Sequence, residues 1–395
     1  ITAENGKPLM WSRIEVTRGA STFRWAAEEA RRWSGELQRL DTDATSAGRM
    51  AVIRRFPNGP VLGIAPFNFP LNLVAHKVAP ALAVGAPIIV KPAPATPMTA
   101  LLLGELLAET DLPAGMWSVL PLANEQTADL VADPRLPVVS FTGSETVGYH
   151  IQASQPTKHV VLELGGNAAA VVLADWSSDA DLEWAATRIA TFGNYQAGQS
   201  CVSVQRVLVD ESVYERFVPL LVAKLEALKT GAPTDEDVQV GPVINDAAAA
   251  RIQSWIDDAV ASGATLLAGG TREGTTIAPT LLSDAPAEAK VSCEEVFGPV
   301  MTIAPVAGVD AALAAVNDSR FGLQAGIFTH DLQIAFRAHR ELVVGGVVIG
   351  DVPSFRADQM PYGGVKSSGL GREGLRAAMT DLTHDRVMVL TGLDL

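Results

Sequence analysis

The sequence predicts an α/β protein of two domains, and three observations support this fold class. The chain has 395 residues, which is more than one hydrophobic core usually organises. Between residues 61 and 166, short apolar runs alternate with helical stretches, a pattern typical of a parallel sheet covered on both faces. A second alternation of the same kind runs from 168 to about 346. Ligands of such sheets are expected at the carboxyl ends of the strands.

The individual elements are predicted in chain order. Apolar residues at helical spacing among charges predict a surface helix from Ile14 to about Glu36. Two apolar stretches, Arg49–Phe56 and Asp385–Leu390, are expected as strands outside both main sheets. The first domain is expected to contain strands at 61–65, 87–90, 117–120, 138–141 and 159–162, with helices at 96–109 and 124–133. In the second domain we expect helices at 179–192, 211–228 and 246–262.

The composition excludes several classes of partner. The net charge of −14 repels nucleic acid and anionic membrane surfaces, so neither is expected as a partner. With only two cysteines no disulfide framework is indicated, and a reducing cytoplasm fits best. We expect neither a signal peptide nor a membrane span. The first residue is Ile1 rather than Met, so we expect a longer natural chain. No metal site is expected, because the six histidines show no ligand spacing.

Two segments at predicted strand ends suit a phosphate-bearing ligand. In the segment Phe141–Gly148 a strand ends in a glycine turn and a helix begins, so backbone N–H groups converge and Ser144 adds a hydroxyl. An ordinary strand-to-helix turn explains that segment equally well. Lys91 leaves an apolar strand and could donate to a ribose or phosphate, although a solvated loop lysine is the commoner case.

Cys201 and Glu163 are candidate reactive groups. Glycine and small polar neighbours before Cys201 would let a substrate approach its sulfur, although a lone cysteine is more often a small buried hydrophobe. Cys293 is assigned to that buried class, because the acids beside it disfavour a thiolate. Glu163 follows an apolar strand and precedes two glycines. It could have a raised pKa and act as a base, or it could be a capping or ion-paired carboxylate.

Seven motifs, in order, make the sequence resemble the aldehyde dehydrogenase superfamily over nearly the whole chain. They are Pro66-Phe67-Asn68-Phe69-Pro70, Lys91-Pro92, Phe141-Thr142-Gly143-Ser144, Glu163-Leu164-Gly165-Gly166, Gly198-Gln199-Ser200-Cys201, Glu295-Val296-Phe297-Gly298-Pro299, and Pro361 to Gly369. The resemblance implies an aldehyde dehydrogenase-like fold with a Rossmann-type cofactor domain, an α/β catalytic domain and a small strand flap for oligomerisation. It also implies a homodimer or homotetramer.

The domain boundaries follow from this resemblance. The cofactor-binding domain is expected at 1–40 and 59–165, with its amino-terminal part apparently missing. The flap is expected at 41–58 and 383–395, which accounts for the two strands outside the main sheets. The catalytic domain is expected at 166–368, and 369–382 as a return segment.

The resemblance implies four catalytic residues. Cys201 would attack the aldehyde carbonyl and form a thiohemiacetal, and loss of hydride would convert this to a thioester. Asn68, with the backbone N–H of Cys201, would form the oxyanion hole. Glu163 would activate the water that releases the acid, and Lys77 would support proton transfer in a relay with Glu163.

The implied cofactor is NAD or NADP. Lys91 would contact the adenosine ribose, Ser144 the pyrophosphate, and Glu295 and Phe297 the nicotinamide ribose and ring. The full expected set is Lys91, Pro66, Phe67, Phe141, Gly143, Ser144, Leu164, Gly165, Glu295 and Phe297. Two departures matter. Phe67 stands where the family commonly has Trp, which reshapes the pocket. Pro94 stands where NAD-preferring members often have Glu, so a 2′-phosphate would not be repelled.

The implied substrate pocket is polar. It would contain Asn72, His76, Ser200, Val202, Phe355 and Arg356. This set favours a small hydroxylated or anionic aldehyde over a fatty or aromatic one, with a lactaldehyde-like or glyceraldehyde-like substrate first and a carboxylated semialdehyde second. The segments from Asp351 and Met360 onward are similar to the lactaldehyde and phosphonoacetaldehyde branches. Alternatively, His76 and Arg356 are held in structural bonds.

Two other functions stay open from the sequence. One is a CoA-acylating aldehyde dehydrogenase, against which Glu163 argues, because such relatives typically lack that carboxylate. The other is a catalytically impaired nucleotide-binding paralogue, against which the presence of Cys201, Asn68 and Glu163 argues.

Overall fold

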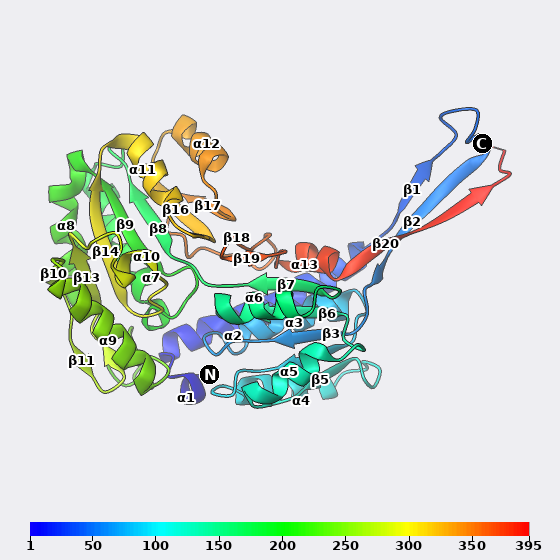
Figure 1. Ribbon diagram of the computed structural model, residues 1–395, viewed down its shortest axis with the longest axis horizontal. Coiled ribbons are helices and arrows are strands. Elements are labelled where there is room, and N and C mark those ends of the chain that lie inside the picture. The colour runs from blue at the N-terminus through cyan, green and yellow to red at the C-terminus, as the bar shows by residue number, and fades with distance from the viewer. Residues whose placement is uncertain (395) are drawn as a thin grey trace.

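The computed structural model describes residues 1–394 as two α/β bodies and a thin extension of strands that projects from one of them (Figure 1). Leu395, the last residue of the expected flap, lies outside the described residues. The predicted fold class is confirmed, because each body is built on its own sheet of mostly parallel strands.

The first body contains a six-stranded sheet in the order β19-β7-β6-β3-β4-β5, in which only β19 is antiparallel to its neighbour. The strands are β3 (Val61–Ile64), β4 (Ile88–Lys91), β5 (Trp117–Val119), β6 (Val138–Thr142), β7 (His159–Glu163) and β19 (Gly369–Leu370). The helices are α2 (Leu9–Arg32), α3 (Asn72–Ala83), α4 (Met98–Ala108), α5 (Asn124–Ala132), α6 (Glu145–Ser154) and α13 (Leu375–Asp381). The central strands are almost continuously apolar because helices cover both faces. Helices α2, α3 and α13 pack on one another.

The second body contains a seven-stranded sheet in the order β10-β13-β14-β9-β8-β16-β17, with β10 antiparallel to β13. The strands are β8 (Ala168–Val172), β9 (Val204–Asp210), β10 (Thr265–Ala268), β13 (Thr280–Ser283), β14 (Val300–Val306), β16 (Gln324–Phe328) and β17 (Gly346–Ile349). The helices are α7 (Asp179–Asn194), α8 (Glu211–Glu226), α9 (Asp246–Ala261), α10 (Lys290–Cys293), α11 (Gly308–Asn317) and α12 (Leu332–Glu341). Side-chain caps fix several helix starts: Ser178 accepts from the N–H of Asp181, and Asn245 from that of Ala248.

The extension is a three-stranded antiparallel sheet in the order β1-β2-β20. Its strands are β1 (Glu36–Arg39), β2 (Arg49–Pro57) and β20 (Thr383–Thr391). The two strands expected outside the main sheets therefore pair with each other. Strand β1 was not expected, and it lies within the 1–40 segment assigned to the cofactor domain. All four of its residues are exposed, so no apolar pattern marks it in the sequence.

The remaining elements are short. They are α1 (Thr2–Asn5), a 3₁₀ turn η1 (Tyr195–Gly198), the pair β11 (Arg272–Glu273) and β12 (Thr276–Ile277), and the pair β15 (Phe321–Gly322) and β18 (Val365–Lys366). The helix expected at 14–36 begins earlier, after Pro8, and ends at Arg32, ahead of the Ser34–Gly35 pair.

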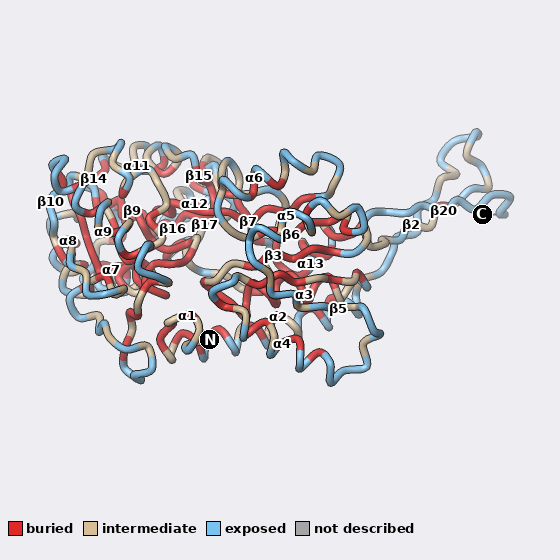
Figure 2. Tube along the Cα trace, turned by 60° about the horizontal axis from the view of Figure 1, so that its bottom comes forward, coloured by how far each residue is buried: buried red, intermediate tan, exposed pale blue. Residues whose placement is uncertain are grey.

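Burial follows the division into two bodies and an extension. Both bodies contain continuous buried segments, whereas the extension is largely exposed (Figure 2). No helix within residues 1–394 is long and apolar enough to cross a membrane.

Candidate active site

A cavity of about 790 Å³ opens at the carboxyl ends of four parallel strands of the first body. The residues that end or follow these strands line it, namely Pro66–Asn68 after β3, Lys91 of β4, Thr142–Ser144 at β6 and Glu163–Gly165 at β7. The second body contributes Cys201, Arg251, Glu295 and Phe297. The position at the strand ends is the one that doubly wound sheets use for ligands. Three of the four predicted catalytic residues and all ten predicted cofactor residues line this one cavity.

Cys201 lies half-buried at the wall of the cavity. Its sulfur is 3.1 Å from the hydroxyl oxygen of Tyr362, and it packs beside the buried side chains of Val202 and Leu323. Burial raises the pKa of the thiol to about 12, the Tyr362 hydrogen bond opposes this rise, and the nearby carboxylate of Glu295 adds to it. The sulfur is thus accessible from the cavity but needs help to ionise.

A strained turn delivers Cys201 to the cavity. Gln196, Ala197 and Gly198 have φ values of 54°, 53° and 70°, all in the left-handed region. Left-handed conformations cost roughly 1 kcal/mol or more per non-glycine residue. Gly198 is required here for a second reason, because a Cβ atom would collide with the carbonyl oxygen of Gly298. This turn is therefore held in place by its surroundings.

Asn68, from the loop after β3, hydrogen-bonds to the residue that follows this turn. Its Nδ2 donates to the carbonyl oxygen of Gln199 at 2.9 Å, and the side chain is only 4% exposed. A side-chain amide nitrogen has two hydrogens, so one remains free in the cavity that Cys201 also lines. Its Oδ1 has no hydrogen-bond partner among the described residues. The arrangement leaves an amide donor available where negative charge would develop on a substrate oxygen.

Asn5 ties these two loops together. Its Nδ2 donates to the carbonyl oxygen of Phe67 at 2.5 Å, and its Oδ1 accepts from Nε2 of Gln196. The Asn5 side chain is 3% exposed and lies at the end of α1. One buried amide thus bridges the residue before Asn68 and the strained turn before Cys201.

Glu163 ends β7 and is buried, at 3% exposure. Neither carboxylate oxygen has a hydrogen-bond partner within residues 1–394. Burial, followed by the charge of Glu373, raises the pKa of Glu163 well above its ordinary value. An unpaired carboxyl with a raised pKa at a cavity wall has the character of a general acid or base.

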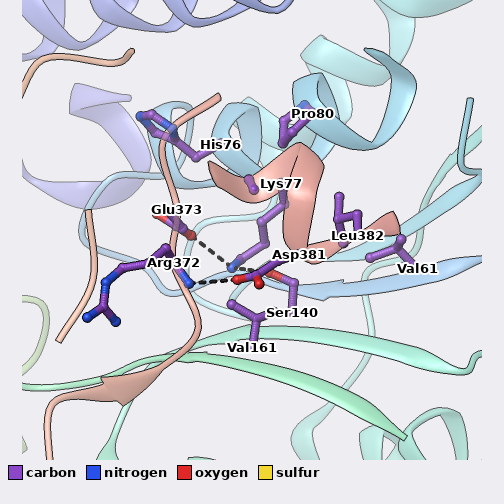
Figure 3. A pocket seen from close by; sticks show the side chains of 11 residues that line it. Val61, His76, Lys77, Pro80, Ser140, Val161, Arg372, Glu373, Asp381 and Leu382 are labelled. Atoms are coloured by element: carbon purple, nitrogen blue, oxygen red, sulfur yellow. Dashed lines mark hydrogen bonds and ion pairs between the residues drawn. The ribbon is translucent and has the colours of Figure 1, made fainter. Parts of the chain in front are cut away.

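Lys77 does not contact Glu163 by a hydrogen bond but lies in a buried ionic cluster behind it. Its Nζ donates to Ser140 Oγ at 3.0 Å and Thr142 Oγ1 at 2.7 Å, and it pairs with Glu373 at 3.4 Å. Figure 3 shows Lys77 extending toward Glu373 beside a cavity of about 10 Å³, which is room for roughly one water molecule. Burial would raise the pKa of Glu373, but the charges of Lys77 and Arg356 prevail and lower it to about 2. Lys77 therefore acts on Glu163 through charge rather than contact.

The predicted cofactor residues form two ends of the cavity. At one end Lys91 Nζ donates to Asn124 Oδ1 at 2.8 Å, and Ser144 precedes α6 without capping it with its side chain. At the other end the rings of Phe67 and Phe297 meet edge to face, 5.8 Å apart. A nicotinamide dinucleotide fits this lining, since the cavity offers the cations of Lys91 and Arg251, a helix N-terminus without a side-chain cap and a pair of aromatic rings.

Glu295 is held against the glycines that follow Glu163. Its Oε1 accepts from the N–H of Gly166 at 2.9 Å, and a Cβ on Gly165 would collide with its carboxylate. Burial raises the pKa of Glu295 to about 7, and the hydrogen bond from Gly166 opposes the rise. Gly165 is therefore needed for close approach, as the paired glycines of the motif suggest.

The six predicted substrate residues, Asn72, His76, Ser200, Val202, Phe355 and Arg356, do not line this cavity. Arg356 lies against Tyr362, the residue whose hydroxyl contacts Cys201. Its guanidinium lies 3.9 Å from the centre of the Tyr362 ring and donates to Glu373 Oε2 at 2.9 Å, while its Nε has no partner among the described residues. Val202 packs beside Cys201, Ser200 and Asn72 are buried, and Phe355 is 50% exposed.

His76 is held by a buried hydrogen bond to Asp358. Its Nε2 lies 3.2 Å from Asp358 Oδ1, which also pairs with Arg18 at 3.1 Å. Burial, and then the charge of Arg356, lowers the pKa of His76 to about 4, so the ring is neutral at physiological pH. The alternative left open from the sequence, a histidine engaged in structural contacts, describes this geometry.

Sequence reasoning missed four residues around the site. Tyr362 lies within the motif from Pro361 to Gly369, and its hydroxyl group could have marked it as a hydrogen-bond donor. Glu373 follows a glycine and an arginine without any periodic pattern, and Asn5 and Arg251 lie far along the chain from the motifs. The assignment of Cys293 to the buried class was wrong, because its side chain is exposed at the end of the short helix α10.

Comparison with known proteins identifies the family. The profile described as "Aldehyde dehydrogenase family" matches residues 1–388. The 3-sulfolactaldehyde dehydrogenase of Priestia megaterium is 43% identical over 391 residues, covering 99% of this chain and 81% of that protein.

Solved structures agree with this match. Aldehyde dehydrogenase 21 from Physcomitrella patens, in complex with the reaction product succinate, superposes with a TM-score of 0.97 at 44% identity, covering 100% of this chain and 81% of that one. The NADP-dependent glyceraldehyde-3-phosphate dehydrogenase from Bacillus halodurans, complexed with NADP, gives a TM-score of 0.94 at 38% identity, with 99% and 81% covered. The chain therefore belongs to the aldehyde dehydrogenase family and is an NAD(P)-dependent aldehyde dehydrogenase.

Proposed function

We propose that the chain oxidises a small polar aldehyde to a carboxylic acid, with Cys201 as nucleophile, Asn68 as oxyanion donor and Glu163 as general base. The observation that supports these roles is their common position. All three side chains line the cavity that also carries the ten candidate cofactor residues. The two polar groups that the chemistry needs, Asn68 and Glu163, are buried with atoms left unpaired.

In the first half-reaction the Cys201 thiolate attacks the aldehyde carbon and forms a C–S bond. The carbonyl oxygen becomes an oxyanion, and the free hydrogen of the Asn68 amide stabilises it together with the N–H of Cys201. When bound, NAD(P)⁺ supplies the acceptor for the hydride that then leaves the carbon. Cys201 is left carrying a thioester.

In the second half-reaction Glu163 removes a proton from water as its oxygen attacks the thioester carbon. The C–S bond breaks, the acid leaves, and Cys201 is released as a thiolate. Because burial raises the pKa of Glu163, the fraction of Glu163 able to act as a base grows with pH. Thioester hydrolysis should therefore accelerate as pH rises on the acid side of the profile.

For the cofactor, Lys91 would hold the adenosine ribose, Ser144 the pyrophosphate, and Glu295 the nicotinamide ribose. Pro94 lines the cavity close to Lys91 in sequence and carries no charge. A carboxylate at this place would repel a 2′-phosphate, so its absence supports use of NADP as well as NAD.

The proposed substrate is a small hydroxylated or anionic aldehyde. The relatives include a 3-sulfolactaldehyde dehydrogenase, and the similar structure from Physcomitrella patens holds the reaction product succinate. Sulfolactaldehyde and succinate both carry an anionic group. In this chain Arg356 does not line the cavity and is paired with Glu373, but its positive charge acts at Cys201. This charge favours a substrate with a negative substituent over an apolar one.

The test is a panel of aldehydes assayed with NAD and with NADP, covering lactaldehyde, glyceraldehyde, 3-sulfolactaldehyde and succinic semialdehyde against hexanal and benzaldehyde. We expect kcat/KM to be roughly tenfold or more higher for the polar members, since one buried polar contact is worth about 1.5 kcal/mol. The Cys201→Ala variant should lose about 10⁴-fold or more of kcat. An apolar preference, or turnover by Cys201→Ala, would contradict the proposal.

The same assay separates two other functions. A rate that requires CoA and yields an acyl-CoA would identify an acylating enzyme. Cofactor binding without turnover of any aldehyde would identify an impaired paralogue. The unpaired Glu163 carboxyl supports hydrolysis instead, because transfer to CoA has no use for a base that activates water.

The strand extension is proposed to pair with a second copy of the chain. Strand β20 is an edge strand that exposes Val387, Met388 and Val389, each at least half exposed. An apolar edge strand of this kind is normally covered in a stable protein. Light scattering on a size-exclusion column should show a dimer or tetramer, and a monomer at micromolar concentration would contradict this.

A further inference from the structure

Tyr362 places a hydroxyl group directly on the proposed nucleophile. Its oxygen lies 3.1 Å from the sulfur of Cys201, and either atom can be the donor in this pair. The tyrosine is buried, at 4% exposure, and packs with Val202 and Leu323. A sulfur–oxygen separation of this size is a hydrogen bond, so the phenol touches the reacting atom.

The backbone fixes the tyrosine in this position. The N–H of Tyr362 donates to the carbonyl oxygen of Glu373 at 2.9 Å, and the N–H of Glu373 donates back to Tyr362 at 2.6 Å. The ring is clamped from its face by the guanidinium of Arg356, 3.9 Å from the ring centre. Arg356 is in turn bonded to Glu373. Both the main chain and the ring of Tyr362 are therefore anchored to one buried residue, the main chain to the backbone of Glu373 and the ring, through Arg356, to its carboxylate.

The groups facing the sulfur divide by charge. The carboxylates of Glu295 and Glu163 disfavour a thiolate, and the guanidinium of Arg356 favours one. Tyr362 also favours the thiolate, as the neutral donor that hydrogen-bonds to the sulfur. Burial raises the pKa of the phenol well above its ordinary value, so Tyr362 keeps its proton while the sulfur ionises.

We propose that Tyr362 is a catalytic residue whose hydroxyl donates a hydrogen bond to the Cys201 thiolate, with Arg356 as the residue that positions the ring. The inference rests on the proposed function of Cys201. The thiol proton leaves to solvent through the cavity that Cys201 lines, the sulfur accepts the phenol hydrogen bond, and Tyr362 remains protonated throughout. When the C–S bond forms, the sulfur loses its charge and the bond to Tyr362 weakens. It is restored when thioester hydrolysis releases the thiolate, so Tyr362 assists both half-reactions.

The test is the Tyr362→Phe variant of the full chain, which removes one oxygen and keeps the ring under Arg356. The rate of alkylation of Cys201 by iodoacetamide is measured by mass spectrometry from about pH 6 to 10. A hydrogen bond to a charged group is worth about 1.5 kcal/mol, so the rate at fixed pH should fall about tenfold and the profile should move upward by about one pH unit. The exposed Cys293 reports in the same sample and should react at an unchanged rate.

Two controls separate this role from a structural one. Tyr149→Phe also removes a tyrosine hydroxyl bond, to the carbonyl oxygen of Lys366 at 3.0 Å, and should leave both cysteines unchanged. Replacing the tyrosines with 3,5-difluorotyrosine makes the phenol a stronger donor and should raise the Cys201 rate relative to Cys293. This second measurement does not depend on how well the phenylalanine variant folds.

Steady-state kinetics provide the last comparison. For Tyr362→Phe we expect kcat to fall about tenfold with KM for the cofactor unchanged. An alkylation profile for Cys201 equal to that of the unmodified chain would overturn the inference. If Cys201→Ala retained turnover, the proposed function itself would fail, and the two failures are therefore distinguishable.

Discussion

Two regions meet at Glu163, and they differ in how their polar groups are paired. On the cavity side, Asn68 Oδ1 and both oxygens of Glu163 are buried without hydrogen-bond partners among residues 1–394. On the far side, buried ion pairs join Lys77 and Arg356 to Glu373, while Asp358 pairs with Arg18 and hydrogen-bonds to the neutral His76. An unpaired buried polar group costs roughly 1–3 kcal/mol. The cavity side thus leaves bonding capacity for reactants, and the far side uses its capacity to hold the scaffold.

The difference teaches where substitutions should act on rate and where they should act on stability. Removing the unpaired carboxylate of Glu163 breaks no internal hydrogen bond and should affect chemistry alone. Removing one member of a satisfied ionic cluster leaves a buried charge without a partner, which destabilises the fold. The following variants test that division.

Glu163→Gln should have the largest effect. The amide keeps the shape but cannot take a proton from water, and a general base contributes about 10²- to 10⁴-fold. We expect steady-state turnover to fall about 10³-fold, while one equivalent of NAD(P)H still forms in a burst and the thioester accumulates. Rapid mixing and intact-protein mass spectrometry measure both. Steady turnover at the normal rate would show that Glu163 is not the general base. A large loss of stability would show that Glu163 supports the fold, as the ion-paired residues on the far side do.

Glu373→Gln should lower the free energy of unfolding by about 3 kcal/mol, because it strands the charges of Lys77 and Arg356 in the interior. Urea titration measures the loss. The control is Glu236→Gln, which breaks an exposed pair with Arg13 and should change stability by less than about 1 kcal/mol. Equal effects of the two substitutions would contradict the division.

The same variant has a defined pH signature. The pKa of Glu373 lies at about 2 instead of 4.5, so its contribution to stability is complete above pH 4.5 and is lost as pH falls toward 2. The stability difference between the unmodified chain and Glu373→Gln should shrink over that window. Because the charge of Glu373 raises the pKa of Glu163, the variant should also move the acid limb of thioester hydrolysis to lower pH. An acid limb that stays in place would show that the two carboxyl groups are not coupled.

Asn5→Ala should have the smallest effect on turnover. It tests whether a fully bonded residue beside the cavity acts on the rate or only on stability. The substitution releases the turn at Gln196 from the loop at Phe67, so Cys201 and Asn68 are held less exactly relative to each other. We expect kcat to fall roughly tenfold with cofactor affinity unchanged, since misplacement by about 1 Å can cost up to 10²-fold. The control, Asn317→Ala, removes a bridging amide far from the cavity, between Glu341 and Val343. Equal kcat values for the two variants would show that the bridge has only a structural role.

The sequence predicted the fold well because its strands and helices are locally encoded. The helices expected at 211–228 and 246–262 are α8 (Glu211–Glu226) and α9 (Asp246–Ala261), since apolar periodicity and side-chain caps coincide there. Strand β1 could not be predicted, because an exposed strand paired only at one edge has no apolar alternation.

The cavity lining was predictable for a different reason. Lys91, Ser144 and Glu163 each stand at the end of an apolar strand, and parallel strands bring their carboxyl ends to one edge. The charged cluster behind them was not predictable in the same way. Glu373, Asp358 and Arg18 come from distant parts of the chain, and their pairing depends on how α2, α3 and the segment before α13 pack.

The position of α13 affects how assembly can be studied. Glu373 precedes this helix by two residues, and β20 follows its end directly. Arg55 of β2 donates to the carbonyl oxygen of Thr380 in the last turn of the helix and to that of Thr383 at the start of β20, and so ties the two elements together. Shortening the chain before Thr383 to obtain single subunits would remove those contacts and loosen the helix beside Glu373, so a loss of activity would not report on association. Polar substitutions at Val387 and Val389, which are half exposed, would weaken the proposed association of chains while leaving that connection intact.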